Sequence, residues 1–258
     1  MKINMTTVQN CLIPVTAVVA WEVFGQLGIL PRYLSTPSTI LAALWELTVS
    51  GELIVGIAAS LYRVAFGFII GTAAGVIVGL GAGLIPGVRH FFDPIVSFLY
   101  PIPKVAFLPV FLLLFGLGHA SKIAIIAFSG FFSVFVASRH AVLSVNPTLI
   151  WAARNMGTPE HTIFFRVIIP AAAPQLFAGI RIGLAHAFVV LFAAELIGSR
   201  AGLGTIISYG EEWGRFDLMF AGIVCFAVLG FASDRILMAI RSRVLRGQLI
   251  GTEEQVVR

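Results

Sequence analysis

Residues 56–85 have the sequence GIAASLYRVAFGFIIGTAAGVIVGLGAGLI, in which Arg63 is the only charged residue. A helix needs about 20 mainly apolar residues to cross the hydrocarbon core of a bilayer, so this stretch is long enough to span it. Glycines recur there every fourth residue and share one helix face, where a second helix can approach closely, namely Gly67, Gly71, Gly75 and Gly79. We therefore predict a membrane-spanning helix whose glycine face serves helix packing.

The composition extends this prediction to the whole chain. Of its 258 residues, 59% are hydrophobic and 11% are charged, and the mean hydropathy is +0.99. Soluble proteins have roughly 45–50% apolar and about 25% charged residues. The sequence therefore predicts an all-α integral membrane protein, and it excludes a soluble enzyme, a disordered scaffold and a secreted disulfide module.

Six apolar runs are candidate transmembrane helices, at about residues 11–30, 56–85, 91–116, 121–143, 172–197 and 217–240. We interpret the first run as a retained span, because only Lys2 precedes it and no signal-peptide cleavage site follows before Pro31. Residues 37–50 are expected to form a capped amphipathic helix outside the bilayer core.

The distribution of basic residues predicts the orientation. Arg235, Arg241, Arg243 and Arg246 lie at the end of the last run and just after it, as expected for a cytoplasmic exit. Six spans bring both termini to the same side, so both are expected in the cytoplasm. The net charge is +5, but the basic residues form no patch with interleaved aromatics, and no nucleic-acid partner is expected.

The longest predicted cytoplasmic segment is residues 144–171. Pro147 can open a short helix from its first turn, and Gly157 suits the left-handed residue that ends one. Thr158 and Pro159 are expected as N-cap and first residue of a second helix, with a break at Pro170 before the fifth span. A short helix across the cytoplasmic mouth is a suitable docking element for a partner.

The spacing in this segment resembles a known signature. Two alanines, three residues, a glycine, nine residues, and then aliphatic-x-aliphatic-proline is similar to the EAA signature of bacterial ABC importer permeases, here at Ala152, Ala153, Gly157, Val167, Ile169 and Pro170. Trp151 stands where the signature has its leading glutamate. If that glutamate normally meets a charge on the ATPase, the contact is absent or replaced, with Arg154 as the candidate replacement.

Further motifs extend the resemblance to the nitrate, sulfonate, taurine and bicarbonate branch of these permeases. They are Pro37-Ser38-Thr39, residues 60–67, Asp93-Pro94, residues 101–104, residues 115–118, Gly179-Ile180-Arg181, Ala194-Glu195 and Gly202-Leu203-Gly204. The resemblance implies the type I ABC importer permease fold, with residues 1–258 as a single transmembrane permease domain in the bacterial inner membrane. It also implies two ATPase subunits, a second permease copy in an expected homodimer, and an external substrate-binding protein.

ATP hydrolysis is expected on the partner and not on this chain. A P-loop needs a lysine directly after a glycine, and Lys2, Lys104 and Lys122, which are all the lysines, follow other residues. We therefore predict no enzyme activity and no cofactor here, with ATP and Mg²⁺ on the partner. Coupling is expected through residues 147–157, and the candidate coupling residues are Ala152, Ala153, Arg154, Asn155, Met156, Gly157 and Thr158.

Polar residues inside the runs give the candidate pathway. Pro101 and Pro103 can break the third run and line a cavity, and Lys104 beside them could attract an anion, or instead fix the helices or snorkel to an interface. Glu195 could act at the external mouth or pair with Arg200. The candidate pathway residues are Pro101, Pro103, Lys104, His186 and Glu195. The five histidines include no i,i+4 pair and no metal site is expected.

Several alternatives stay open. A self-sufficient secondary transporter or channel is the second hypothesis, although the first three runs show no repeat in the last three. Residues 202–213 predict an external helix, either a lid, a dock for the binding protein or an inert connection. The expected solute is a small anion such as a sulfonate, taurine, nitrate or an organic carboxylate, with a pyrimidine-type vitamin precursor as the alternative.

Overall fold

The computed structural model describes residues 5–31 and 33–246, with side chains described from residue 12 onward, and all regular structure in that part is helical. The α-helices are α1 (Met5–Gln26), α2 (Pro37–Val49), α3 (Glu52–Leu84), α4 (Pro86–Leu99), α5 (Leu108–Phe115), α6 (His119–Leu143), α7 (Pro147–Asn155), α8 (Glu160–Ile163), α9 (Ile169–Leu196), α10 (Leu203–Glu212) and α11 (Phe216–Val244). A 3-10 turn, η1 (Lys104–Phe107), precedes α5, and a π-helical turn, η2 (Phe164–Ile168), joins α8 to α9.

Four of the described helices are long and apolar enough to cross a membrane: α3, α6, the continuous run Glu160–Leu196, and α11. A fifth candidate is the bent pair Pro86–Leu99 and Lys104–Phe115. The described apolar part of α1, Leu12–Gln26, is shorter, and α1 ends before the predicted residue 30. Gly28, with φ +71°, takes a left-handed conformation just after that end.

The third predicted run, 91–116, is not a straight span. α4 ends at Leu99, and helical structure resumes at Lys104. The segments Pro86–Leu99 and Lys104–Phe115 are bent by 94° relative to each other. Pro101 and Pro103 explain the break, because proline has no backbone N–H and forces the preceding residue away from helical geometry. The expected effect of these prolines on the helix is confirmed, and the run forms a bent pair of helices.

The predicted break at Pro170 is absent. The helix continues from Glu160 to Leu196, and Pro170 lies in the first turn of α9. The five residues of η2 take π-helical geometry directly before it. A proline inside a helix clashes with the carbonyl four residues earlier, and the wider π turn lets the helix accommodate Pro170 without ending.

The glycine face of α3 packs against α6, as the sequence predicts. A Cβ added at Gly75 would lie 2.8 Å from Cβ of Val134, and one at Gly79 would lie 2.7 Å from Cβ of Ser138. Such distances leave no room for a side chain, so the glycines set the spacing of these two helices. α6 packs in turn along α9, so α3, α6 and α9 form the centre of the bundle.

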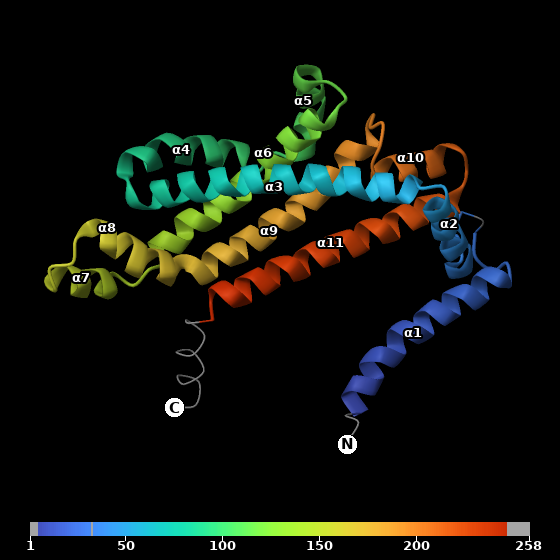
Figure 1. The fold of residues 1–258 in the computed structure, drawn as a ribbon, viewed down its shortest axis with the longest axis horizontal. Coiled ribbons are helices and arrows are strands. Elements are labelled where there is room, and N and C mark those ends of the chain that lie inside the picture. The colour runs from blue at the N-terminus through green and yellow to red at the C-terminus, as the bar shows by residue number, and fades with distance from the viewer. Residues whose placement is uncertain (1–4, 32, 247–258) are drawn as a thin grey trace.

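Two pairs of short helices lie at opposite ends of the bundle (Figure 1). α2 and α10 lie at one end, called here the α10 end, and α7 and α8 lie at the other, the α7 end. A large buried cluster that includes Ile40, Leu191 and Leu203 joins α2, α9 and α10 to the long helices. A second cluster that includes Ala153, Ile163 and Ile168 holds α7 and α8 against the bundle.

Candidate functional site

A cavity of about 460 Å³ opens at the break between α4 and α5, and it is called here the break cavity. Residues 100–105 of the break form one wall, while α6 contributes Ser129, Phe132 and Ser133, and α9 contributes His186, Val189 and Val190. Four of the five candidate pathway residues lie here: Pro101, Pro103, Lys104 and His186. The structure thus brings together residues that are as much as 85 positions apart in the sequence, Pro101 and His186.

Lys104 holds the broken chain in place. Its Nζ donates to the carbonyl oxygens of Leu99 (2.8 Å), Tyr100 (2.9 Å) and Ile102 (2.9 Å). The ammonium also lies 4.9 Å from the centre of the Phe132 ring. The last carbonyls of a helix lack partners within it, and an ammonium has three N–H donors. Lys104 therefore caps the end of α4 and leaves its positive charge beside the cavity.

His186 and Ser133 form a polar pair in the lining of the cavity. The Ser133 Oγ and the His186 Nδ1 are 2.6 Å apart, and they join α6 to α9. Ser133 is buried, whereas His186 is exposed. Within the described part of the chain, Nε2 of His186 has no hydrogen-bond partner, so this nitrogen can interact with a molecule in the cavity.

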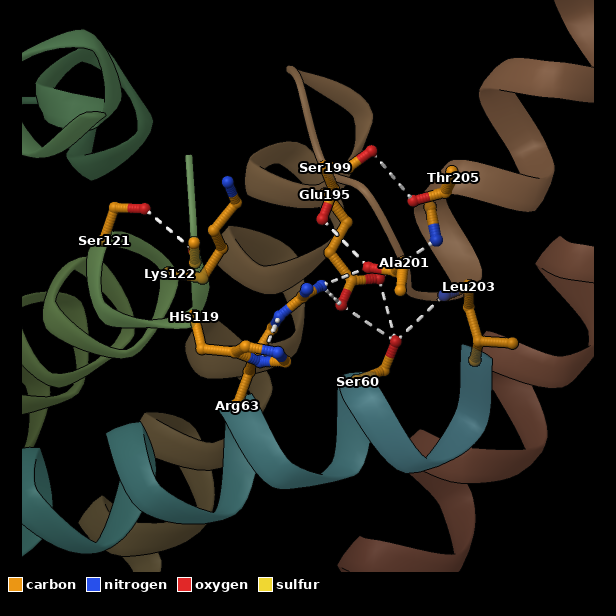
Figure 2. A network of polar contacts seen from close by, with 12 residues as sticks. Ser60, Arg63, His119, Ser121, Lys122, Glu195, Ser199, Ala201, Leu203 and Thr205 are labelled. Carbon is orange, nitrogen blue, oxygen red and sulfur yellow. Dashed lines mark hydrogen bonds and ion pairs between the residues drawn. The ribbon is translucent and has the colours of Figure 1, made fainter. Parts of the chain in front are cut away.

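Glu195, the fifth candidate, does not line the break cavity. It is 1% exposed near the α10 end, and its Oε1 lies 2.7 Å from Nη1 of Arg63 on α3. The predicted pairing with Arg200 is wrong, because the side chain of Glu195 points inward to α3 and not along its own chain (Figure 2). Ser60 Oγ donates to the same carboxylate at 2.8 Å. This group is called here the Glu195 network.

The Glu195 network holds the start of α10. The backbone N–H of Leu203 donates to Oγ of Ser60 at 3.0 Å (Figure 2). The backbone N–H of Gly204 donates to Oε2 of Glu195, also at 3.0 Å. A carboxylate suits a helix N-terminus, where free N–H groups and the helix dipole favour negative charge. A Cβ at Gly202 would lie 2.6 Å from the carboxylate, so the glycines of Gly202-Leu203-Gly204 allow Glu195 to approach.

Two cations secure the loop before α10. Arg63 Nη1 donates to the carbonyl of Ala201 at 2.6 Å, and its Nε donates to Nδ1 of His119 at 3.2 Å (Figure 2). Lys122, which is fully buried on α6, donates to the carbonyls of Leu117 (2.7 Å) and Gly198 (3.4 Å). The sequence did not identify the partners of Arg63 or Lys122. The available signal was the presence of both cations inside apolar runs, where ionisable residues need partners.

The predicted coupling segment forms the helix α7. Asn146 caps its start, since Oδ1 accepts from the N–H of Thr148 at 2.9 Å. Its end has Gly157 at φ +75°, with N–H bonds from Gly157 to the carbonyl of Arg154 (2.9 Å) and from Thr158 to that of Ala153 (3.1 Å). These are the two bonds of a Schellman motif, as the position of Gly157 predicts.

Thr158 ends α7 and does not start the next helix, so its predicted role as N-cap is wrong. The N-cap of α8 is Pro159, at φ −68° and ψ 148°, without a side-chain cap bond. The cause is the Schellman motif, which uses the N–H of Thr158 to close α7 and leaves the extended residue one position later.

The side chains of the coupling segment divide into one anchor and an exposed surface. Ala153 is buried against Ile163, while Trp151 and Met156 are 61% and 77% exposed. Arg154 Nε lies 2.7 Å from Oε1 of Glu160, and hydrogen bonding to Glu160 raises the pKa of Arg154. Ala152, Asn155 and Gly157 are exposed and Thr158 is half-buried, so most of the candidate coupling residues are accessible to a partner.

Metal binding has no support in the described residues. No group of three or more histidine, cysteine, aspartate or glutamate side chains there could hold a metal ion. The described residues instead provide three features: a largely apolar cavity beside Lys104 and His186, α10 held by the Glu195 network at one end of the bundle, and the exposed helix α7 at the other end.

Comparison with known proteins gives three consistent similarities. Residues 71–246 match the family model described as "Binding-protein-dependent transport system inner membrane component". The chain is 34% identical over 239 residues to a Bacillus subtilis protein assigned as an aliphatic sulfonates transport permease, covering 92% of this chain and 87% of the relative. It is also 34% identical over 231 residues to the taurine transport system permease protein of Escherichia coli, covering 87% and 83%.

Solved structures support the fold. A structure titled as an amino acid ABC transporter with histidines gives a TM-score of 0.59 at 19% identity, with 79% of this chain and 97% of that chain covered. The inward-facing MetNI methionine ABC transporter gives 0.55 at 20% identity, covering 77% and 94%. At these identities the similarity establishes the arrangement of helices alone.

Proposed function

Because the chain belongs to the family of binding-protein-dependent transport system inner membrane components, we propose that it forms the translocation pathway of an ATP-driven importer for a small anionic solute. The observation that carries the proposal is the break cavity, which lies between the break, α6 and α9 beside the charge of Lys104 and has no acidic residue among its described lining residues. The similarity to permeases named for sulfonates and taurine supports an organic sulfonate as the solute.

The broken helix supports a pathway at this place. Irregular backbone inside a membrane needs partners or water for its free polar groups, and it occurs where it is buried in protein or lines a cavity. The carbonyls freed between Leu99 and Ile102 have such a partner in Lys104. The break can therefore expose polar groups to a solute without losing its own structure.

We propose that α7 couples the pathway to two copies of a separate ATPase. Its exposed Trp151 and Met156 provide a contact surface, and its buried Ala153 connects that surface to α8 and η2. Because α8, η2 and α9 form one continuous helix, a displacement of α7 would be transmitted to His186 on α9. Closure of the ATPases would then change the access of the break cavity from one side of the membrane to the other.

We propose the remaining parts of the assembly as well. The α7 end would face the cytoplasm of a bacterial cell, and the α10 end would face an external substrate-binding protein. A second copy of this chain would complete the pathway as a homodimer. Both termini would lie in the cytoplasm, in agreement with the basic residues at the end of α11, Arg241 and Arg243.

Uptake by the reconstituted assembly tests the proposal. The permease would be placed in liposomes with its ATPase and binding protein, and uptake of labelled taurine and ethanesulfonate would be measured with and without internal ATP. We expect ATP-dependent uptake that other small oxyanions reduce. Equal transport without ATP and without the ATPase would instead establish a secondary transporter or channel. Competition only by a pyrimidine vitamin precursor would overturn the proposed substrate class.

A further inference from the structure

The positive charge of Lys104 lies beside the break cavity, but its N–H groups are not free to bind a solute. Its three N–H groups have three carbonyl acceptors within 2.9 Å, so none is left for a molecule in the break cavity. The charge itself is not neutralised by a carboxylate, because no acidic residue is among the lining residues described. Lys104 can therefore attract an anion through its electrostatic potential without binding it directly.

His186 has the free nitrogen that Lys104 lacks. With Nδ1 held 2.6 Å from the Ser133 hydroxyl, the ring is fixed and Nε2 is left without a partner in the described part of the chain. The Ser133 hydroxyl has no other acceptor in the described part of the chain, so it donates to Nδ1 and the ring proton is on Nε2. In this tautomer Nε2 donates a hydrogen bond, which is what an anion requires.

We propose that the break cavity is a transient binding site for a small oxyanion, in which Lys104 supplies the positive potential and Nε2–H of His186 makes the contact. The rest of the described lining is largely apolar, with Phe132, Val189 and Val190 able to accept a short alkyl group. A site with one contacting donor binds weakly, and weak binding suits a pathway that must also release the solute. The role of this site in import rests on the proposed function, whereas the binding itself does not.

Charge-selective labelling of the cavity tests the role of Lys104. Val189 lines the cavity and is 61% exposed, so Val189→Cys can be modified there, in a background in which Cys11 and Cys225 are replaced by alanine. The rates would be measured for a negatively charged and a positively charged methanethiosulfonate of similar size. We expect the negatively charged reagent to react about tenfold faster or more, as for one unit charge within about 10 Å at an effective dielectric constant of about 20.

Two Lys104 variants and one control position make this result specific. Lys104→Met should abolish the preference for the negatively charged reagent, and Lys104→Arg should keep it. If Lys104→Met fails to fold, the unsubstituted Lys104 background still decides the question, because equal rates for both reagents there would overturn the proposal. Trp213→Cys at the α10 end, where the side chain is 70% exposed, should show no change between Lys104 variants.

Protection by ethanesulfonate tests His186 as the contacting group. Ethanesulfonate should slow modification of Val189→Cys, and tetramethylammonium should not. His186→Phe should raise the concentration needed for half protection about tenfold, the cost of one charge-assisted hydrogen bond, while His186→Gln, which keeps an N–H donor, should raise it less. Unchanged protection in His186→Phe would remove His186 from the site. These assays need neither ATP nor partners, so they test the binding site separately from transport. Protection by ethanesulfonate without ATP-driven uptake would contradict only the proposed function. ATP-driven uptake without charge-selective labelling would contradict only this inference.

Discussion

Glu195 and Arg63 are buried together, with their side chains 0% and 3% exposed and 2.7 Å between Oε1 and Nη1. A buried ion pair compensates its desolvation only when further hydrogen bonds satisfy the remaining polar atoms. Here the Ser60 hydroxyl and the N–H of Gly204 donate further hydrogen bonds to the carboxylate, and the carbonyl of Ala201 accepts one from Arg63. The pair therefore connects α3 and α9 to the start of α10.

Removal of the carboxylate charge should destabilise the protein strongly. Glu195→Gln leaves the guanidinium of Arg63 buried without a counter-charge, and breaking a buried pair in this way costs about 3–5 kcal/mol. Glu160→Gln is the matched control, because the side chains of Glu160 and Arg154 are 69% and 52% exposed and exposed ion pairs contribute little to stability.

Thermal unfolding in detergent, followed by size-exclusion chromatography, measures both variants. We expect a much lower midpoint for Glu195→Gln than for Glu160→Gln, and partial recovery in the double variant Arg63→Gln with Glu195→Gln. Similar midpoints for the two single variants would contradict a structural role for the buried pair.

At the scale of single elements, α7 shows how a local motif defines a helix of nine residues. Its ends depend on Asn146 and Gly157, both of which act through the backbone within the segment itself. Gly157 has open space where a side chain would be, so a substitution there changes backbone strain and not packing. This allows the coupling role to be tested separately from folding.

Gly157→Val should uncouple ATP hydrolysis from uptake. A β-branched residue at φ +75° costs about 1–2 kcal/mol, which is enough to disturb the end of α7 but not the insertion of the long helices. Gly157→Asn is the control, since asparagine tolerates the left-handed conformation. The measurement is the ratio of solute transported to ATP hydrolysed at equal membrane levels. Normal transport by Gly157→Val would refute the coupling role of α7.

The contact between α3 and α6 gives a second test on the scale of elements. Gly75→Leu would force the side chain into Val134 and the carbonyl of Phe131, at 2.8 and 2.9 Å from the new Cβ, and overpacking of this kind costs about 1–3 kcal/mol. Gly81→Ala on the same helix would meet only Val88 at 3.6 Å. We expect a lower yield of folded protein for Gly75→Leu and near wild-type yield for Gly81→Ala.

At the scale of the molecule, the two ends of the bundle differ in kind. The α7 end presents an exposed helix with Trp151 and Met156, whereas at the α10 end a buried ion network fastens α10 onto the long helices (Figure 1). This difference between the ends suits an importer in which an ATPase binds at one end and the solute enters at the other.

Membrane-impermeant thiol labelling tests this polarity. With Cys11 and Cys225 replaced, Met156→Cys should react only from the cytoplasmic side and Trp213→Cys only from the external side, because both positions are at least 70% exposed and lie at opposite ends. Labelling of intact cells and of inverted vesicles distinguishes the two sides. Labelling of both positions from the same side would contradict the proposed orientation.

The sequence alone predicted what depends on hydrophobicity and on local backbone chemistry. It predicted an all-helical membrane protein, the glycine face of α3, the helix α7 with Gly157 at its end, and the effect of Pro101 and Pro103 on the third run. These features follow from neighbours within a few residues, so their signals are present in short stretches of sequence. The continuous helix at Pro170 was not predicted, because a proline ends a helix in some sequences and is accommodated by a local π turn in others.

Only the tertiary structure decided which distant polar groups meet. Glu195 pairs with Arg63, 132 positions away, and not with Arg200 nearby, since the helix directs its side chain toward α3. Lys104 is identifiable in the sequence as an intramembrane charge, yet the bend of 94° is what turns it onto the carbonyls of its own break and brings His186 to the same cavity. Hydrophobicity determines which segments enter the membrane, but the partner of each buried charge depends on how the helices pack.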